Sequence, residues 1–386
     1  MRILLLGEYS NVHATLAQGF RKLGHEVTVA SNGDFWKNYD KDIDLSRRQG
    51  KAGGIRLAIK IIRNLKHFRG YDIVQLINPM FVELKAERIF LLYKYLRKHN
   101  NRVVLCAMGM DYYWVNSGTN IKPLRYSDFN FGNQLRTNKD AIKERKDWLG
   151  TQKEALNRMI ALDCDAIICG LYEYWIAYKD YFVEKTHFIP LPIIPLTTQP
   201  QPTKHLKNKE EQKCQDKLKV FIGINKERSV YKGTDIMLQA ARDIHHQFPQ
   251  LIDLKIAENI PFNEYRELMK DCDVILDQLY SYTPSMNSLE AMNQGLICVG
   301  GGEPENYEIL NDTDLKPIIN VLPTYHSVYN QLLFLIQHPT LIDKLKKDSK
   351  EYINKYHDYM KIASNYLHIY ENLLRKKTTV KAHKDI

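Results

Sequence analysis

Three cations lie in one short segment between a predicted strand and a predicted helix. Residues 223–233 leave an apolar run and contain Lys226, Arg228 and Lys232, and a helical pattern begins at Gly233. Fixed positive charges beside a helix N-terminus neutralise a diphosphate, because the free backbone N–H groups and the helix dipole act on the same anion. The segment therefore predicts a phosphate-binding loop, with a solvated basic loop as the alternative.

A second segment combines small polar residues with a carboxylate. In residues 280–295 a strand ends, a polar loop follows, and a helix is predicted to begin near Met286. The backbone amides of Ser285, Met286 and Asn287 can face phosphate, and Glu290 can accept hydrogen bonds from both hydroxyls of a ribose. An exposed helix glutamate is the alternative, but open α/β sheets bind ligands in loops outside the carboxyl ends of their strands.

The two segments together resemble the signatures of glycosyltransferase family 4, and the resemblance covers nearly the whole chain. The matching residues are Gly223, Arg228, Lys232 and Gly233 in the first segment, and Glu290, Ala291, Met292 and Gly295 in the second. The resemblance implies a retaining enzyme of the GT-B fold, in which two Rossmann-like domains face each other and a nucleotide-diphosphate sugar is held between them. It also implies that Arg228 and Lys232 act in catalysis by holding the donor diphosphate, that Glu290 binds the ribose, and that no further cofactor is needed.

The loop before the second helix departs from the family pattern. Tyr282 stands eight residues before Glu290, where the family usually has a glutamate that contacts the donor sugar, and Thr283 and Ser285 replace the usual glycines. Arg228 stands four residues before Lys232 rather than five, so Lys226 competes with it for the diphosphate. The donor-binding set predicted with the resemblance is Glu290, Tyr282, Ser285, Met286, Asn287 and Lys226.

Two residues of the first half are candidates for the acceptor side. Asp111 ends the segment 108–111, which follows a predicted strand and resembles the family's Gly-x-Asp. It can orient an acceptor hydroxyl, or it can cap a loop. His13 ends the loop after the first strand, where the family often has paired glycines and this chain keeps only Gly7. His13 is either an acceptor-side residue or an ordinary residue at the start of a helix.

These segments need a scaffold of alternating strands and helices. Short apolar runs with helical periods between them indicate strands at 2–7, 26–30, 72–77, 102–107, 165–169, 187–189, 218–223, 253–257, 273–277 and 296–300. Strands that alternate with helices form parallel sheets. The predicted fold class is therefore α/β with two Rossmann-like domains.

A proline-rich and then highly charged segment separates the two halves of the 386-residue chain. We expect an N-terminal acceptor-side domain over residues 1–195, a linker over 196–217, and a C-terminal nucleotide-sugar-binding domain over 218–355. The last helical pattern, 356–386, is expected to pack back on the first domain.

Residues 163–172 and 271–280 are similar, and each begins with Asp-Cys-Asp. They are either equivalent strands of two similar domains or a local convergence of strands that follow acidic helix ends. Each Asp-x-Asp precedes a strand, whereas metal-dependent transferases of the other common fold place theirs after one. No His-Glu-x-x-His or Cys-x-x-Cys is present, so no metal site is predicted.

The net charge of +10 favours anionic partners. No zinc-finger spacing or aromatic RNA-binding motif is present, so nucleic acid is not the expected partner. In the basic stretch 55–68, Ile55, Ile59, Ile62 and Leu65 share one side. This helix either lies on an anionic membrane surface or packs on the sheet with its basic residues outward.

We expect the protein to act in the cytoplasm, peripherally on the inner membrane face where it meets a membrane, because no apolar run is long enough to span a bilayer or form a signal peptide. The predicted function is a metal-independent, retaining transfer of a sugar to a glycan or lipid-linked acceptor, as in polysaccharide biosynthesis. The alternatives are a sugar-nucleotide epimerase on the same fold and a non-catalytic glycan-binding protein at a membrane surface.

Overall fold

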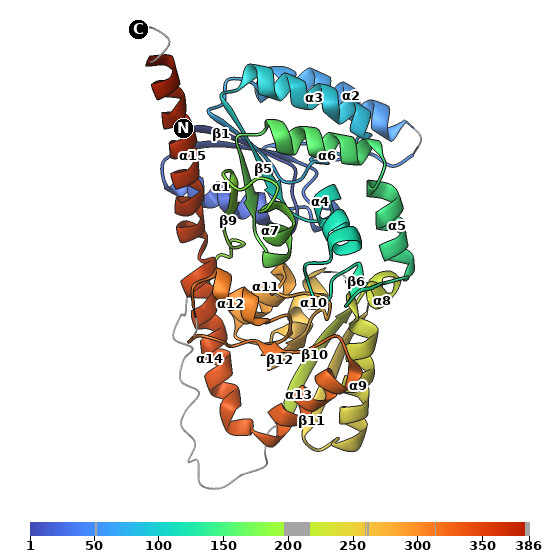
Figure 1. Cartoon of the computed structure of the whole chain (residues 1–386). Helices are drawn as coiled ribbons and strands as arrows, with labels where there is room; N and C mark the ends of the chain where they lie inside the picture. Colours follow the sequence, from blue (N-terminus) through green and yellow to red (C-terminus); the bar gives the residue numbers. More distant parts are fainter. Residues whose placement is uncertain (51, 197–216, 259, 261, 313, 383–386) are drawn as a thin grey trace. The chain divides into compact units, whose positions relative to one another are not determined.

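The computed structural model describes residues 1–50, 52–196, 217–258, 260, 262–312 and 314–382 (Figure 1). The chain divides into two compact units. Unit 1 comprises Met1–Pro192 and the chain from Tyr356 onward, and unit 2 comprises Ile193–Lys355. Most of the predicted linker, residues 197–216, lies outside the described residues.

Unit 1 contains, in the part of the chain described, a seven-stranded parallel sheet in the order β3-β2-β1-β4-β5-β8-β9. The strands are β1 (Arg2–Leu6), β2 (Glu26–Ser31), β3 (Ile43–Asp44), β4 (Ile73–Leu76), β5 (Arg102–Ala107), β8 (Ala166–Cys169) and β9 (Thr186–Phe188). Ile3, Leu4, Leu5 and Leu6 have no exposed surface, as expected for a parallel strand covered on both faces. This burial explains why the strands appear in the sequence as continuous apolar runs.

The helices of unit 1 alternate with these strands. They are α1 (Val12–Lys22), α2 (Gly53–Asn64), α3 (Ala86–His99), α4 (Tyr112–Asn116), α5 (Lys139–Trp148), α6 (Gln152–Asp163) and α7 (Tyr172–Tyr178). A short hairpin, β6 (Asn130–Phe131) and β7 (Gln134–Leu135), follows α4.

The C-terminal helix α15 (Tyr359–Ala382) belongs to unit 1 and packs against α1. The rings of Phe20 and Tyr366 meet edge to face with centroids 6.3 Å apart. Gly19 lies so near α15 that a Cβ atom added there would be 2.7 Å from the Cβ of Ala363. The expected return of the C-terminal helix to the first domain is confirmed.

Unit 2 contains, within its described residues, a five-stranded parallel sheet in the order β11-β10-β12-β13-β14. Its strands are β10 (Leu218–Ile224), β11 (Ile252–Glu258), β12 (Val274–Leu276), β13 (Ile297–Gly300) and β14 (Ile319–Asn320), and its helices are α8 (Ser229–Lys232), α9 (Thr234–Gln247), α10 (Phe262–Met269), α11 (Met286–Gln294), α12 (Pro304–Ile309), α13 (Tyr325–Gln337) and α14 (Ile342–Tyr352). Buried aliphatic side chains of β10, β12 and β13 pack with those of α9 and α13. The predicted α/β class with two parallel sheets is confirmed.

The two Asp-Cys-Asp segments precede β8 and β12, but these strands are not equivalent. β12 lies beside β10, as β4 lies beside β1, whereas β8 lies between β5 and β9. The hypothesis of equivalent strands is therefore wrong. The likeness has a local cause, since Asp165 accepts a hydrogen bond from the backbone N–H of Val103 at 2.8 Å and Asp273 accepts one from Lys219 at 2.9 Å. Each aspartate thus bonds to the beginning of the neighbouring strand.

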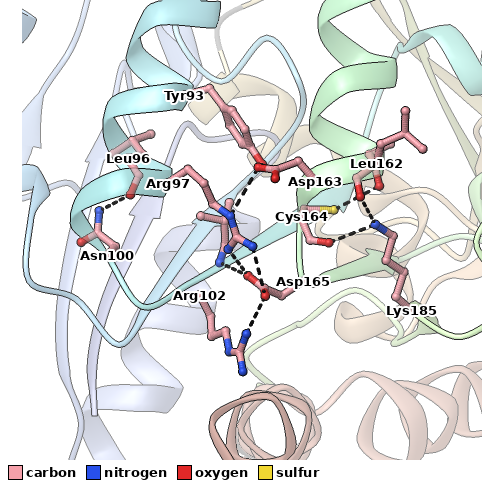
Figure 2. Close-up of polar contacts among 12 residues, drawn as sticks. Tyr93, Leu96, Arg97, Asn100, Arg102, Leu162, Asp163, Cys164, Asp165 and Lys185 are labelled. Carbon is pink, nitrogen blue, oxygen red and sulfur yellow. Dashed lines mark hydrogen bonds and ion pairs between the residues drawn. The ribbon is translucent and has the colours of Figure 1, made fainter. Parts of the chain in front are cut away.

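The aspartates of the first of these segments are also paired with cations and a hydroxyl. Figure 2 shows Arg97 and Arg102 converging on Asp165, with Arg102 at 2.9 Å, and the hydroxyl of Tyr93 donating to Asp163 at 2.8 Å. These contacts join α3 and β5 to the residues that directly precede β8. The two carboxylates stabilise the amino-terminal edge of the sheet, opposite to the edge where ligands bind.

Candidate functional site

The strand order of unit 2 reverses at β10, because β11 lies on one side of it and β12 on the other. Open parallel sheets bind ligands outside the carboxyl ends of their strands at such a switch point. The loops that follow β10 and β12 are the two segments that the sequence predicts to bind a donor. The adjacent strand β13 adds a third loop, residues 301–303, to the same edge.

The basic loop after β10 is partly helical. Asn225 caps a 3-10 turn, Lys226–Arg228, through hydrogen bonds from the backbone N–H groups of Glu227 and Arg228. Arg228 is exposed, and its guanidinium lies 5.0 Å from the centroid of the Tyr231 ring. A guanidinium over an aromatic face gains cation–π attraction, which holds the side chain in place without using its N–H donors.

The other two cations of this loop have different surroundings. Lys226 is exposed and forms an ion pair of 2.7 Å with Glu258 at the end of β11. Lys232 is half-buried at the end of α8. The ammonium of Lys226 therefore already has a carboxylate partner.

Gly233 joins the basic loop to the loop after β12. Its φ is +75°, and an added Cβ atom would lie 2.9 Å from the Cβ of Leu279 and 3.0 Å from the ring of Tyr280. The backbone N–H of Leu279 donates to the carbonyl oxygen of Lys232 at 3.0 Å. Only glycine meets both requirements at low cost, because it tolerates positive φ and has no side chain. The structure thus brings the two predicted donor segments together.

Asp277 organises the loop after β12, and sequence analysis missed it. It is 6 % exposed and accepts hydrogen bonds from the hydroxyls of Ser285 and Ser288, the latter at 2.6 Å, and from the amide of Asn287 at 3.0 Å. Three donors on one buried carboxylate fix the first turn of α11. The available signal was its place directly after a buried strand.

The amide groups at the start of α11 remain open to a ligand. Ser285 is the N-cap residue, but its hydroxyl is bonded to Asp277, and no side chain of the described residues caps the helix. Met286 and Asn287, the first two residues of α11, are half-buried. Their N–H groups project from the helix N-terminus, where the helix dipole favours an anion.

Glu290 lies one turn inside α11 and is half-buried. Desolvation raises the pKa of its carboxyl above the ordinary value, and the guanidinium of Arg266 on α10 opposes that rise. Arg266 was not identified from the sequence, because it belongs to a separate helix.

A second residue of α10 supports the same loop. The hydroxyl of Tyr265 donates to the side-chain oxygen of Asn287 at 2.9 Å. Its ring lies over the end of β10, where a Cβ atom on Gly223 would be 2.6 Å from it. The absence of a side chain at Gly223 therefore leaves room for the ring of Tyr265.

The side chain of Tyr282 is 1 % exposed, so it forms part of the interior of unit 2. Its carbonyl oxygen accepts a hydrogen bond from the backbone N–H of Glu303 at 3.1 Å. From the sequence, Glu303 and Glu305 either contact the nucleotide or cap a helix over residues 306–310, and the cap is the preferred interpretation. Helix α12 begins instead at Pro304, and Glu303 occupies the N-cap position without a side-chain capping bond. The helix thus begins two residues earlier than predicted, because proline is well suited to the first helical position.

The loop after β1 in unit 1 contains a buried polar network. Glu8 is 1 % exposed and accepts hydrogen bonds from the backbone N–H groups of Ala14 at 2.8 Å and His13 at 3.3 Å. Burial raises the pKa of Glu8 to about 8, against the opposing effect of those two donors. The carboxyl oxygens of Glu8 thus occupy N–H groups at the first turn of α1 that would otherwise be available to an external ligand.

His13 is fully buried and connects this loop to the C-terminal helix. Its Nδ1 lies 2.8 Å from the carbonyl oxygen of Gly7, and its Nε2 lies 3.0 Å from the side-chain nitrogen of Gln75. The side-chain oxygen of Gln75 in turn accepts a hydrogen bond from the hydroxyl of Tyr370 on α15. Burial lowers the pKa of His13 to about 4, so the imidazole is neutral at pH 7.

Asp111 is also fully buried and caps α4. It accepts hydrogen bonds from the backbone N–H of Trp114 at 2.8 Å and from the hydroxyl of Tyr178 at 2.7 Å. Burial raises its pKa to about 6, although both hydrogen bonds act in the opposite direction. Of the two alternatives for Asp111, an acceptor-orienting residue or a cap, the structure shows the cap.

Among the described residues no group of three His, Cys, Asp or Glu side chains is arranged to hold a metal ion. In the same part of the chain, no helix combines the length and the apolar composition needed to cross a bilayer.

Comparisons with known proteins show the fold. No family model and no curated protein matches the sequence. Among solved structures, the chain is similar to the sucrose-phosphate synthase of Thermosynechococcus elongatus, with a TM-score of 0.60, 12 % identity and coverage of 97 % of this chain and 100 % of the other. It is also similar to Anabaena HepE in complex with UDP-glucose, with a TM-score of 0.59, 11 % identity and coverage of 96 % and 100 %.

A third similar structure is a UDP-GlcNAc 2-epimerase from Neisseria meningitidis bound to UDP-GlcNAc, with a TM-score of 0.55, 12 % identity and coverage of 97 % and 100 %. The two parallel sheets and the returning C-terminal helix, together with these similarities, define the GT-B fold. At this level of identity, the comparisons establish the architecture.

Proposed function

We propose that the protein is a glycosyltransferase that moves a sugar from a nucleotide-diphosphate donor to a glycan or lipid-linked acceptor. The observation that supports this most directly is the junction of Lys232 and Gly233 with Leu279 and Tyr280, which sets the basic loop beside the polar loop at the switch point of unit 2. HepE, which has a similar fold, was solved with UDP-glucose, so UDP is the first probe of this site.

In the proposed reaction, the chain stabilises a departing nucleoside diphosphate. Negative charge develops on the leaving group as the anomeric carbon becomes cationic, and fixed donors aimed at that charge lower the barrier. Arg228 and Lys232 would supply positive charge, and the amides of Met286 and Asn287 would supply neutral donors at the start of α11. Because side-chain cations neutralise the diphosphate, we propose that transfer needs no divalent metal and, on the family resemblance, retains the anomeric configuration.

The other predicted residues have supporting places in this proposal. Glu290 binds the ribose, and Ser285 and Lys226 border the phosphate site. Tyr282 acts from the interior by holding the loop in shape. Asp111 and His13 serve the acceptor side by fixing the loops after β5 and β1, because both side chains are buried and bonded to neighbouring groups.

A panel of UDP-, GDP- and ADP-sugars, followed by NMR of the products, tests the proposal. Hydrolysis or transfer with a retained anomeric configuration, undiminished by a chelator, is expected. Interconversion of two nucleotide sugars without release of nucleotide would favour the alternative of an epimerase. The observation that motivates this alternative is the similarity to the UDP-GlcNAc 2-epimerase from Neisseria meningitidis. Failure of every nucleoside diphosphate to raise the melting temperature would favour a non-catalytic glycan-binding protein.

A further inference from the structure

Helix α2 of unit 1 has two apolar stripes, and only one of them is covered. Leu57 and Ile61 are buried, 2 % and 4 % exposed, and attach the helix to the unit. Ile55, Ile59 and Ile62 follow one another at helical spacing and are 56 %, 44 % and 64 % exposed. One of the two interpretations of the sequence packs the stripe of Ile55, Ile59 and Ile62 on the sheet, but the helix packs through Leu57 and Ile61 instead. The three isoleucine side chains therefore face water.

The neighbouring helix α3 extends this apolar face. The hydroxyl of Tyr95 on α3 donates to the carbonyl oxygen of Leu65 at 2.9 Å, and Figure 1 shows α2 and α3 side by side. Leu91 lies one turn before Tyr95 on the same side of α3 and is 70 % exposed. Contiguous exposed aliphatic side chains are uncommon on monomeric proteins and mark interaction surfaces.

Basic side chains border the exposed stripe. A groove of about 420 Å³ beside it is lined by Ser46, Arg48, Arg56, Ile59, Lys60 and Arg63. Lys60 is paired with Asp44 at 2.7 Å, whereas Arg48, Arg56 and Arg63 form no ion pair with any residue that the structure describes. Three guanidinium groups thus remain available to an external anion.

Most of the net positive charge of the chain lies in and around α2. Residues 46–70 contain eight of the 55 Lys and Arg residues and no Asp or Glu, so the remainder of the chain is nearly balanced at 47 against 45. A surface that joins exposed aliphatic groups to uncompensated cations is complementary to a bilayer with anionic headgroups. A nucleic acid would satisfy the cations but would leave the isoleucines without an apolar partner.

We propose that the exposed face of α2, extended by Leu91, docks unit 1 on an anionic membrane surface. Ile55, Ile59 and Ile62 enter the boundary between headgroups and acyl chains, and Arg48, Arg56 and Arg63 bind lipid phosphates. This inference is independent of the proposed transfer reaction, because docking is measured without nucleotide.

Sedimentation of the full-length protein with vesicles tests the docking. The protein is expected to sediment with phosphatidylcholine vesicles that contain about 30 % phosphatidylserine and to stay in the supernatant with pure phosphatidylcholine. Because juxtamembrane cations each contribute about a fivefold factor, Arg56→Glu with Arg63→Glu should weaken binding at least about 25-fold. Lys139→Glu with Lys146→Glu on α5 makes the same charge change at exposed sites of another helix and should weaken it far less.

The apolar half of the proposal has its own variant. Ile55→Ser, Ile59→Ser and Ile62→Ser together should weaken binding at least about tenfold, since each removes a side chain that would be buried in the bilayer boundary. The matched control combines Ile121→Ser, Val183→Ser and Leu322→Ser, which are 53 %, 75 % and 51 % exposed elsewhere. Unchanged melting temperatures confirm that each variant is folded.

Equal binding to neutral and anionic vesicles, no binding to either, or full binding by the isoleucine variant would each overturn the docking proposal. So would tight binding of single-stranded RNA together with no binding to vesicles. A loss of vesicle binding with unchanged affinity for UDP would support docking, and it separates this inference from the proposed donor site.

Discussion

The backbone N–H of Leu279 donates a hydrogen bond to the carbonyl oxygen of Lys232, with 3.0 Å between nitrogen and oxygen. This bond ties the end of the basic loop to the loop after β12. It also places the positive φ of Gly233, +75°, at the contact between the two loops. The relative position of the proposed phosphate-binding groups therefore depends on one residue without a side chain.

Gly233→Ala is predicted to destabilise unit 2 and to disturb the donor site. An alanine at positive φ costs about 1–2 kcal/mol, and its Cβ would overlap Leu279 and Tyr280, so a total loss of about 2–4 kcal/mol is expected. The affinity for UDP should fall at least about tenfold, because the two loops must separate. Urea unfolding and calorimetric titration measure the two effects.

Gly24→Ala is the matched control. Gly24 also has a positive φ, +83°, but nothing lies within 4 Å of its added Cβ. It should therefore show the conformational cost of about 1–2 kcal/mol alone and bind UDP normally. Equal stability losses in the two variants would contradict the assigned overlap.

The cations of the basic loop are predicted to contribute unequally to the binding of a nucleoside diphosphate. Arg228→Ala should weaken the affinity for UDP by about 10- to 100-fold, the range for a lost charge-assisted hydrogen bond. Lys226→Ala should have a smaller effect, because the ammonium of Lys226 is already paired with Glu258 at 2.7 Å. Calorimetric titration at two salt concentrations measures both affinities. A larger loss for Lys226→Ala would transfer the diphosphate role to that residue.

Glu290 is predicted to recognise the ribose rather than the phosphates. Glu290→Ala should weaken the affinity for UDP by about tenfold, as expected when hydrogen bonds to a charged group are lost. It should leave the weaker affinity for 2′,3′-dideoxy-UDP unchanged, because that analogue lacks both hydroxyls. Competitive titration of the two nucleotides against the parent and Glu290→Ala measures the coupling between the Glu290 carboxyl and the ribose hydroxyls. Parallel losses for the two nucleotides would show that Glu290 acts elsewhere in the site.

The sequence predicts most of the strands of this fold and much less of their order. Fully buried parallel strands such as β1 appear as apolar runs, and glycines mark several of their ends. The neighbours of a strand in its sheet depend on contacts between distant segments of the chain. The hydrophobic periodicity of one segment gives no information about such contacts. The strands after the two Asp-Cys-Asp segments therefore look equivalent in sequence, although β8 and β12 occupy different places in their sheets.

Local motifs predict the two donor segments, but their supporting residues come from elsewhere. Asp277 and Tyr265 fix the start of α11 from a strand end and from α10, and neither belongs to a recognisable spacing. Helical periodicity has a similar limit in α2. It shows that Ile55 and Ile59 share one side, but the structure buries Leu57 and Ile61 instead, and that choice depends on contacts with distant parts of the chain.

The stability of unit 1 is predicted to depend on pH through Glu8. Burial raises the pKa of Glu8 to about 8 from the ordinary glutamate value of 4.5. Between these values the folded protein holds the proton and the unfolded chain releases it. The unfolded state therefore binds fewer protons, so the contribution of Glu8 to stability falls as the pH rises through this window.

Glu8→Gln cannot titrate and should lack this slope. Relative to the parent, its free energy of unfolding should improve by up to about 1.4 kcal/mol for each pH unit between about pH 5 and pH 8. Urea unfolding at four pH values measures the difference. Glu26→Gln is the control, because Glu26 has an exposed side chain paired with Arg2 at the surface. Parallel stability profiles for the parent and Glu8→Gln would mean that Glu8 is ionised in the folded protein throughout this range.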